Sequence, residues 1–260
     1  PQDRHRFPRP VQQQPEQAVQ LGQTGYQLFC KEQGVVTRLL QRSQQLLEQQ
    51  AFVCQEKSSN VIWADAKFFS ELSADGLLAN KTEINADLLR PHFWQQQQAV
   101  VGSSKGRNTV WFVKAAGREW VLRHYYRGGL VGKLNKDWFW PVPVTQSRAM
   151  AEFRLLRQMH QAGLPVPLPG LALFQRRGFG YSADILLQRI EGAQDLSQLL
   201  QQRALTAAEW QQVGAMIRAF HQQQIWHSDL NCHNILYAAG RFYLIDFDKC
   251  GQRGGQQWKA

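Results

Sequence analysis

Residues 227–249 read HSDLNCHNILYAAGRFYLIDFDK, and this stretch decides the fold and most of the candidate site. Two short apolar runs, 235–237 and 242–245, flank a turn of small residues, which is the pattern of a β-hairpin. In an antiparallel hairpin, the residue before the first strand lies beside the residue after the second strand. We therefore predict that Asn234 and Asp246 are neighbours.

The polar side chains of this stretch have the chemistry of a metal-assisted site. Amide and carboxylate oxygens suit a hard cation such as Mg²⁺, which proteins hold with few ligands of their own plus substrate phosphates. We therefore predict Asn234 and Asp246 as metal ligands. The remaining carboxylate, Asp229, is then free to orient or deprotonate a hydroxyl.

The pattern His-x-Asp-Leu-x-x-x-Asn, followed by an apolar strand and Asp-Phe-x, resembles the catalytic and metal-binding loops of the protein-kinase-like superfamily. The segments HSDLNCHNIL, LIDFDKC, VLRHYYRGGLVGKLNKD and AGLPVP are together similar to the 3-deoxy-D-manno-octulosonic acid (Kdo) kinases of Gram-negative lipopolysaccharide assembly. This resemblance runs from about Phe93 to the C-terminus. It implies an α+β, two-lobed protein-kinase-like fold, with an antiparallel-sheet N-lobe that has one helix and a mostly helical C-lobe that is truncated.

Three positions depart from the protein-kinase pattern. Asn231 stands where Ser/Thr kinases carry a catalytic-loop lysine, and Asp248 replaces the glycine of Asp-Phe-Gly. Ser228 replaces an arginine, which removes the usual partner of a phosphorylated activation loop. These departures favour a kinase of small molecules over a regulated protein kinase.

A glycine-containing turn at 102–107 lies between two short strands that we predict at 99–101 and 109–113. Glycines let backbone N–H groups approach phosphate oxygens, and two basic residues add charge. Such turns are common in hairpins, so the interpretation depends on the position of the turn ahead of the catalytic loop. The predicted nucleotide-binding residues of this turn are Gly102, Lys105, Gly106 and Arg107.

The next predicted strand, 120–122, leads into Arg123, at the position where the third strand of a protein kinase carries a phosphate-binding lysine. Arginine binds phosphate with two parallel donors and is not a simple replacement for lysine. Lys114 is an alternative, as is a surface role for Arg123. A helix is predicted over 147–161, and its Glu152 would pair with Arg123 and position it on the phosphates.

Two further strands, 171–174 and 185–188, are expected to complete a five-stranded sheet. Residues 188–192 resemble the hinge between kinase lobes, whose backbone would bind adenine. Thr206 and Glu209 have the spacing of a capping box, and a helical apolar stripe follows them.

Basic and aromatic residues alternate over 125–136, a segment for which the resemblance implies a role that faces the substrate. A solvated basic loop is the alternative. The aromatic residues at 138–140 are expected either to pack beneath the N-lobe or to touch lipid.

We divide the chain into a Gln-rich extension (1–58) that is expected to be poorly ordered, a lead-in segment (59–92), a kinase-like N-lobe (93–188), and a hinge with a partial C-lobe (189–260). An amphipathic helix is an alternative for the first part. The chain begins with proline and stops soon after Asp246, so we expect a fragment trimmed at one or both ends.

The composition sets further limits. A chain of 260 residues can bury a full core in one or two domains. The formal net charge of +10 implies attraction to a polyanion, whether nucleic acid, anionic lipid or a phosphorylated substrate. The four cysteines have neither metal-ligand nor small-disulfide spacing, which favours a reducing cytosol. Because the N-terminus has no apolar h-region, we expect no signal peptide, and no apolar run approaches the ~18–20 residues that span a bilayer.

The resemblance implies that ATP and Mg²⁺ are used to phosphorylate a Kdo hydroxyl on a lipid A precursor. Such an enzyme would bind peripherally to the anionic cytoplasmic face of the bacterial inner membrane. Neither nucleic acid nor an obligate protein partner is expected.

Two alternatives remain at this point. One is a related kinase that acts on a protein or on another small molecule. The other is a non-catalytic basic module that binds RNA or membrane, but the complete set of Asp229, Asn234 and Asp246 argues against lost catalysis.

Overall fold

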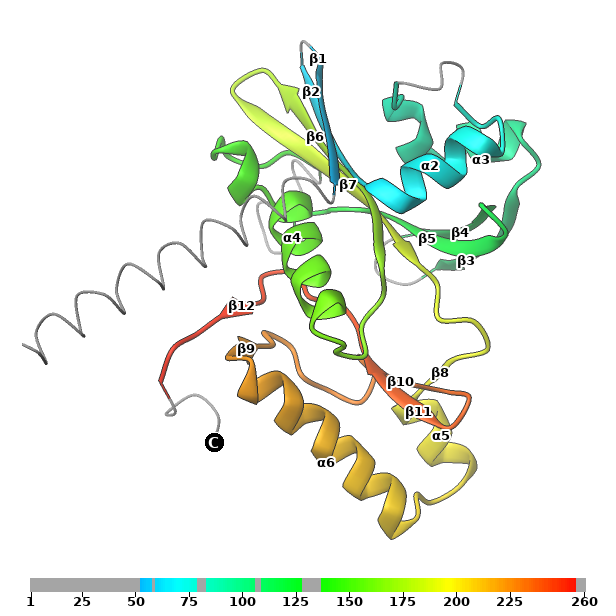
Figure 1. Ribbon diagram of the computed structural model, residues 1–260, viewed down its shortest axis with the longest axis vertical. Helices are drawn as coiled ribbons and strands as arrows, with labels where there is room; N and C mark the ends of the chain where they lie inside the picture. Colours follow the sequence, from blue (N-terminus) through cyan, green and yellow to red (C-terminus); the bar gives the residue numbers. More distant parts are fainter. Residues whose placement is uncertain (1–51, 58, 79–82, 106–108, 128–136, 256–260) are drawn as a thin grey trace, which may run out of the picture. The chain divides into compact units, whose positions relative to one another are not determined.

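The computed structural model describes residues 52–57, 59–78, 83–105, 109–127 and 137–255 (Figure 1). Contacts between residues divide the chain into two units, Pro1–Ala51 and Phe52–Ala260, and the described residues all belong to the second. Residues 1–51 of the predicted Gln-rich extension therefore lie outside the described residues.

A seven-stranded sheet forms the N-lobe, in the order β1-β2-β6-β7-β5-β4-β3. Every neighbouring pair is antiparallel. Its strands are β1 (Phe52–Lys57), β2 (Asn60–Asp65), β3 (Val100–Lys105), β4 (Thr109–Ala115), β5 (Arg118–His124), β6 (Pro169–Arg177) and β7 (Gly180–Gln188). The five strands that the sequence predicted correspond to β3–β7.

The remaining elements complete an α+β fold. The described helices are α2 (Ala66–Ala74), η1 (Ala86–Leu89), α3 (Pro91–Gln96), η3 (Val144–Gln146), α4 (Arg148–Gln161), α5 (Leu196–Gln202) and α6 (Ala207–Gln222). The short strands are β8 (Gln194–Asp195), β9 (Ile225–Trp226), β10 (Ile235–Ala238), β11 (Arg241–Leu244) and β12 (Gly251–Gln252). The predicted helix over 147–161 is confirmed as α4.

The sheet begins at Phe52, ahead of the boundary at residue 93 that the sequence predicted for the N-lobe. Strands β1 and β2 and helices α2 and α3 were not predicted. The reason lies in the position of β2, which pairs with both β1 and β6 and is buried on both of its faces from Val61 to Ala64. A strand that is buried on both faces reads as a continuous apolar run without the alternation that identifies a half-exposed strand.

The glycine-containing turn is also shorter than predicted. Gly102 pairs with Phe112 and Lys105 pairs with Thr109, so residues 102–105 belong to β3. Strand β3 lies at the edge of the sheet, where polar and small residues are tolerated. The rest of the predicted turn lies outside the described residues.

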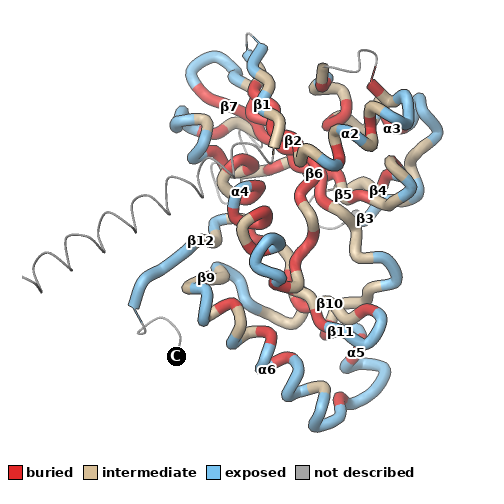
Figure 2. Tube along the Cα trace, in the orientation of Figure 1, coloured by how far each residue is buried: buried red, intermediate tan, exposed pale blue. Residues whose placement is uncertain are grey.

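The sheet has two covered faces, and side-chain alternation along β5 assigns residues to them. Trp120 and Leu122 pack into a core with residues of α2, η1 and α3. Val121 and Tyr125 pack instead into a core with residues of α4, as does the Phe153 side chain of that helix. Figure 1 shows these helices on either side of the sheet, and Figure 2 shows how thoroughly α4 and the central strands are buried.

The core beneath α4 continues into the second lobe, which contains α5, α6 and a small sheet in the order β11-β10-β8. Helix α6 begins with the predicted capping box, since the Thr206 side chain accepts from the N–H of Glu209 while the Glu209 side chain accepts from the N–H of Thr206. In the part of the chain that the structure describes, no helix is both long and apolar enough to cross a bilayer.

Candidate active site

The hairpin of β10 and β11 brings the two predicted metal ligands together. Ile235 pairs with Leu244, and the N–H of Ile245 donates to the carbonyl oxygen of Asn234 at 2.9 Å. Asn234 and Asp246 therefore lie at the same end of the hairpin, as the sequence predicted. Asp246 has a φ of 64°, in the left-handed region that a non-glycine residue adopts only when its surroundings hold it there.

The loop before β10 holds Asp229 in place mainly through its backbone, with one long side-chain bond from Nδ2 of Asn234 to Oδ2 of Asp229 at 3.4 Å. The side-chain nitrogen Nδ2 of Asn234 donates to the carbonyl oxygen of Asp229 at 2.8 Å. The N–H of Asp229 donates to Nδ1 of His227 at 3.2 Å, and Nε2 of His227 donates to the carbonyl oxygen of Ile245 at 2.9 Å. Both contacts of the ring are satisfied by a neutral imidazole with its proton on Nε2. His227 therefore braces the loop, while Asp229 is exposed.

The oxygens at this end of the hairpin fit a divalent cation. Nδ2 of Asn234 donates a hydrogen bond to Asp229, which leaves Oδ1 of the same side chain available as a ligand. Asp246 has one oxygen paired with Arg123, and its other oxygen accepts no hydrogen bond from the described residues. No group of three or more His, Cys, Asp or Glu side chains that could hold a metal ion by themselves occurs within the described ranges. Two protein oxygens fit Mg²⁺ that is held jointly with phosphates.

Arg123 joins the strand β5 to helix α4 and to the hairpin. Its Nη1 contacts Oδ1 of Asp246 at 2.6 Å, and its Nη2 contacts Oε2 of Glu152. The Tyr125 hydroxyl donates to the same Glu152 oxygen at 2.5 Å and accepts from Arg123 at 3.2 Å. The predicted contact between Arg123 and Glu152 is present, and the Glu152 side chain is only 1% exposed.

Burial and the charge of Glu152 have opposite effects on the pKa of Arg123, and both raise the pKa of Tyr125. Burial alone would lower the pKa of Arg123, but the negative charge of Glu152, together with Tyr125 and Asp246, raises that pKa well above its usual value. Burial and the nearby charge of Glu152 raise the pKa of the Tyr125 hydroxyl well above its usual value, so Tyr125 stays protonated and can donate. Arg123 Nε and Glu152 Oε1 are buried without a hydrogen-bond partner among the described residues. The cluster thus has unused donor and acceptor capacity.

A second ion pair fastens the segment after Asp246 to the start of α4, and the sequence did not predict it. Nε of Arg148 donates to Oδ1 of Asp248 at 2.8 Å, and Nη2 contacts the other carboxylate oxygen. The Ser228 hydroxyl donates to the carbonyl oxygen of Asp248 at 2.9 Å. Two of the departures from the protein-kinase pattern, Ser228 and Asp248, therefore connect the loop before β10 with the segment after β11. The available signal was the position of Arg148 one helical turn before Glu152, on the same face of α4.

Comparison with known proteins assigns this arrangement to a family. Residues 91–260 match the lipopolysaccharide kinase (Kdo/WaaP) family. The chain belongs to this family. A 3-deoxy-D-manno-octulosonic acid kinase of Mannheimia succiniciproducens is 49% identical over 176 residues, which are 65% of this chain and 73% of that protein. The Haemophilus influenzae protein of the same name, from strain 86-028NP, is 48% identical over 67% of this chain and 76% of its own length.

Solved structures give a more distant likeness. A structure described as WaaP in complex with acyl carrier protein shares 15% identity, with a TM-score of 0.43 over 65% of this chain and 74% of that one. The Cydia pomonella granulovirus kinase PK-1 also shares 15% identity, with a TM-score of 0.41 over 62% of this chain and 55% of that one. The Kdo/WaaP assignment rests on the sequence match.

The structure brings some of the predicted site residues of this Kdo/WaaP chain together and does not describe others. Asp229, Asn234, Asp246, Arg123 and Glu152 are brought together by the contacts above. Gly102 lies within β3, and nothing is described for the side chain of Lys105 or for Gly106 and Arg107. Lys114, the alternative to Arg123, is exposed on β4 and pairs with no acidic side chain in the described ranges. Most of the basic 125–136 segment also lies outside the described residues.

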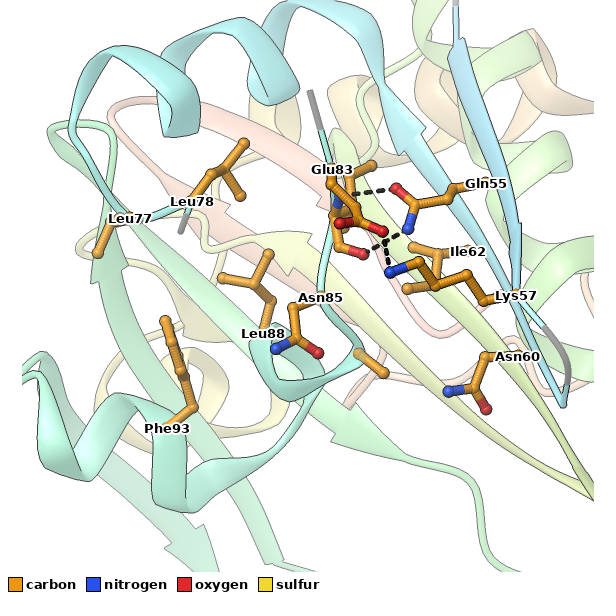
Figure 3. Close-up of a pocket in the computed structure, with 12 residues that line it drawn as sticks. Gln55, Lys57, Asn60, Ile62, Leu77, Leu78, Glu83, Asn85, Leu88 and Phe93 are labelled. Atoms are coloured by element: carbon orange, nitrogen blue, oxygen red, sulfur yellow. Dashed lines mark hydrogen bonds and ion pairs between the residues drawn. The ribbon is translucent and has the colours of Figure 1, made fainter. Parts of the chain in front are cut away.

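A cavity of ≈ 240 Å³ lies elsewhere in the N-lobe, between β1, β2 and the segment around η1 (Figure 3). None of the predicted site residues that the structure describes lines it. Its polar side chains are already engaged: the Gln55 amide bonds to both backbone groups of Ile84, at 3.0 and 2.7 Å, and Lys57 pairs with Glu83. The cavity therefore offers packing and no chemistry for phosphoryl transfer.

We expect Asp246→Ala to remove the effect of Mg²⁺ on nucleotide binding. With Mg²⁺, the variant should bind ATP at least about tenfold more weakly than the parent, a loss of ~1.4 kcal/mol, because one of two protein oxygens for the cation is gone. Calorimetric titrations with ATP, with and without Mg²⁺, measure this. Glu56→Ala, which removes an exposed carboxylate of β1, serves as the control. An unchanged Mg²⁺ effect in Asp246→Ala would contradict the metal-ligand assignment.

Proposed function

We propose that this chain transfers the γ-phosphoryl group of ATP to a hydroxyl of a Kdo residue on a lipid A precursor. One observation carries the proposal: a chain of the lipopolysaccharide kinase (Kdo/WaaP) family holds Asp229 on a braced loop beside Asn234 and Asp246. Its relatives that are 44–49% identical are named 3-deoxy-D-manno-octulosonic acid kinase, which supports Kdo as the acceptor.

Each residue has a role in this proposal. Asp229 orients the acceptor hydroxyl and takes its proton, because its carboxylate is exposed and pairs with no cationic side chain among the described residues. Asn234 and Asp246 hold Mg²⁺, which when bound neutralises charge on the phosphates. Arg123 binds phosphate oxygens, with Glu152 fixing its direction. The predicted phosphate contacts of Gly102, Lys105, Gly106 and Arg107 remain part of the proposal.

Positioning and charge neutralisation account for most of the rate enhancement in phosphoryl transfer. The transition state is loose, so the protein itself has little covalent chemistry to perform. The arrangement suits that requirement. Arg123 is shared between α4 and the hairpin, so nucleotide binding on it is coupled to the geometry at Asp246. The second pair, Arg148 with Asp248, adds another tie between the same two elements.

The experiment that tests the reaction is transfer of labelled γ-phosphate from Mg-ATP to Kdo-bearing lipid A precursor. We expect label in the glycolipid and none in a lipid A precursor that lacks Kdo. Folded protein that binds Mg-ATP but labels neither lipid would remove the Kdo assignment. Label in both lipids would point to a different acceptor hydroxyl.

The proposed location is the cytoplasmic face of the inner membrane, bound peripherally. The net charge of +10 supports it, since each well-placed Lys or Arg contributes about 1 kcal/mol at an anionic surface. We predict that the protein sediments with vesicles containing anionic lipid at low salt and is largely released at ~1 M salt, where the Debye length falls to ~3 Å. Vesicles of zwitterionic lipid alone are the control. Binding that is equal at both salt concentrations would contradict an electrostatic attachment.

A further inference from the structure

An open groove of ≈ 690 Å³ lies next to the segment that carries Asp246, and of its lining residues only Arg148 takes part in the active-site contacts described above. Its lining combines aliphatic and aromatic side chains with three cations. The lining residues are Arg127, Phe139, Trp140, Val142, Arg148, Tyr181 and Lys249. Among the described residues, no acidic side chain lines it, so it suits a ligand that is both apolar and negatively charged.

The apolar wall of the groove is held rigidly. The N–H of Phe139 donates to the carbonyl oxygen of Tyr181 at 2.8 Å, and the reverse bond is 3.0 Å. The two rings are stacked with centroids 5.3 Å apart. Glycine is required opposite them, because a Cβ at Gly180 would lie 2.2 Å from the Phe139 carbonyl oxygen and 2.3 Å from the Trp138 ring. The backbone of this segment is therefore fixed onto the β6–β7 hairpin.

Trp140 is exposed although its neighbours are anchored. Its side chain is 65% exposed and Val142 is 37% exposed, while Phe139 between Trp138 and Trp140 is only 9% exposed. The Trp140 ring packs against Trp138 at a centroid distance of 5.1 Å, and the Trp138 ring nitrogen donates to the carbonyl oxygen of Arg177 at 3.1 Å. A large apolar side chain that is pre-positioned in this way gains binding energy at little entropic cost when a ligand covers it.

The cations of the groove differ in their availability. Arg148 is engaged by Asp248, as described above, and also lies over the rings of Tyr125 and Phe139. Lys249 is exposed, and neither it nor Arg127 pairs with an acidic side chain in the described ranges. Lys249 also has a φ of 62°, a left-handed conformation that is costly for a lysine. That conformation fixes the course of the chain at this edge of the groove.

The groove adjoins the loops of the proposed reaction. Lys249 follows Asp248, whose carbonyl oxygen accepts from Ser228, and Ser228 directly precedes Asp229. A ligand whose charged end reaches Lys249 therefore lies beside the loop that holds Asp229.

We infer that this groove binds the acceptor glycolipid, an inference that rests on the proposed function. Arg127 and Lys249 contact the negatively charged carboxylate and phosphate groups of the sugar portion, and Trp140 with Val142 contacts the start of an acyl chain. The acceptor hydroxyl is thereby presented to Asp229. The groove supplies both halves of this recognition, because its apolar wall is on the 139–142 segment and its available cations are at Arg127 and Lys249.

The test measures binding and transfer separately for two acceptors: Kdo-bearing lipid A precursor in detergent micelles, and the same sugar phosphate with its acyl chains removed. We expect Trp140→Ala to raise the Kd and KM of the acylated acceptor about tenfold and to leave those of the acyl-free acceptor unchanged, since the variant lacks the apolar surface that the acyl chain covers. Lys249→Ala should raise both constants for both acceptors, again roughly tenfold. The KM for ATP should stay the same in both variants.

Matched controls come from exposed residues away from the groove. Phe179 is 92% exposed at the β6–β7 turn, so Phe179→Ala removes an exposed aromatic side chain outside the groove lining. Lys67→Ala removes an exposed lysine from α2. Both controls should bind and phosphorylate the acceptors as the parent does. Unchanged melting temperatures identify variants whose fold is intact.

The outcomes separate this inference from the proposed function. If the parent phosphorylates the glycolipid and the groove variants match it, the groove assignment is overturned and the kinase assignment stands. If the parent binds the glycolipid through Trp140 and Lys249 but transfers nothing to it, the groove assignment stands and the proposed reaction fails. If the parent does not bind the glycolipid, or binds only a single-stranded oligonucleotide through these residues, the inference is overturned.

Discussion

Replacing Arg123 with alanine is expected to cost about 3–5 kcal/mol of unfolding free energy and to abolish phosphoryl transfer. The reason is that the Glu152 carboxylate, only 1% exposed, would be left as a buried charge without its cationic partner. Asp246 would lose its partner as well, but its side chain is 43% exposed, so water can solvate the carboxylate and the loss of stability there is smaller. Urea unfolding of parent and variant measures the first effect, and labelled-phosphate transfer measures the second.

A set of variants separates stability from function at this position. Replacing the whole cluster, in the variant Arg123→Met/Glu152→Leu/Tyr125→Phe, should recover most of the lost stability, because no buried polar group remains unpaired. Transfer should not recover, since the phosphate-binding cation is still missing. Arg123→Lys should be intermediate in stability and still strongly impaired in transfer, because one ammonium cannot reproduce the fork that reaches Glu152, Tyr125 and Asp246. A loss of less than ~1 kcal/mol in Arg123→Ala would mean that the pair is not buried as described.

The part of the fold that the sequence predicts well depends on local pattern. The β10–β11 hairpin, the helix that carries Glu152 and the capping box at Thr206 each have a signal within a few residues. Once the hairpin is recognised, the closeness of Asn234 and Asp246 follows from the geometry of paired strands alone. The pairing of Glu152 with Arg123 required the resemblance to kinases as well, because nothing local links strand β5 with helix α4.

The parts that the sequence missed depend on tertiary contacts. Strand β2 lies inside the sheet and is buried on both faces, so the pattern of its residues gives no period. The pair of Arg148 with Asp248 joins two segments that are distant in the sequence, and each residue taken alone looks like an ordinary surface charge. The Tyr125 hydroxyl shares the Glu152 carboxylate with Arg123. Two residues that are two apart in extended chain lie on one face, but their common partner is on helix α4 and cannot be identified from that pattern.

Asp229→Ala is expected to lower the rate of transfer by about 10²–10⁴-fold, the usual contribution of a positioned acid–base group. The loss should appear in kcat, while the affinity for Mg-ATP stays within about twofold of the parent, because Asp229 is not among the proposed metal ligands. Its side chain is exposed and accepts only a long bond of 3.4 Å from Nδ2 of Asn234, while its shorter contacts run through its backbone N–H and carbonyl, so the variant should also keep the parent's melting temperature.

Two comparison variants sharpen this prediction. Asp229→Asn keeps the shape of the side chain and removes its basicity, so a rate as low as that of Asp229→Ala would assign the effect to proton acceptance and not to orientation of the hydroxyl. Glu56→Ala removes another exposed carboxylate, on β1, and should transfer phosphate like the parent. If Asp229→Ala retained more than about a tenth of the parent rate on the Kdo-bearing acceptor, Asp229 could not be the catalytic base. The proton would then have to leave through another group at the same end of the hairpin.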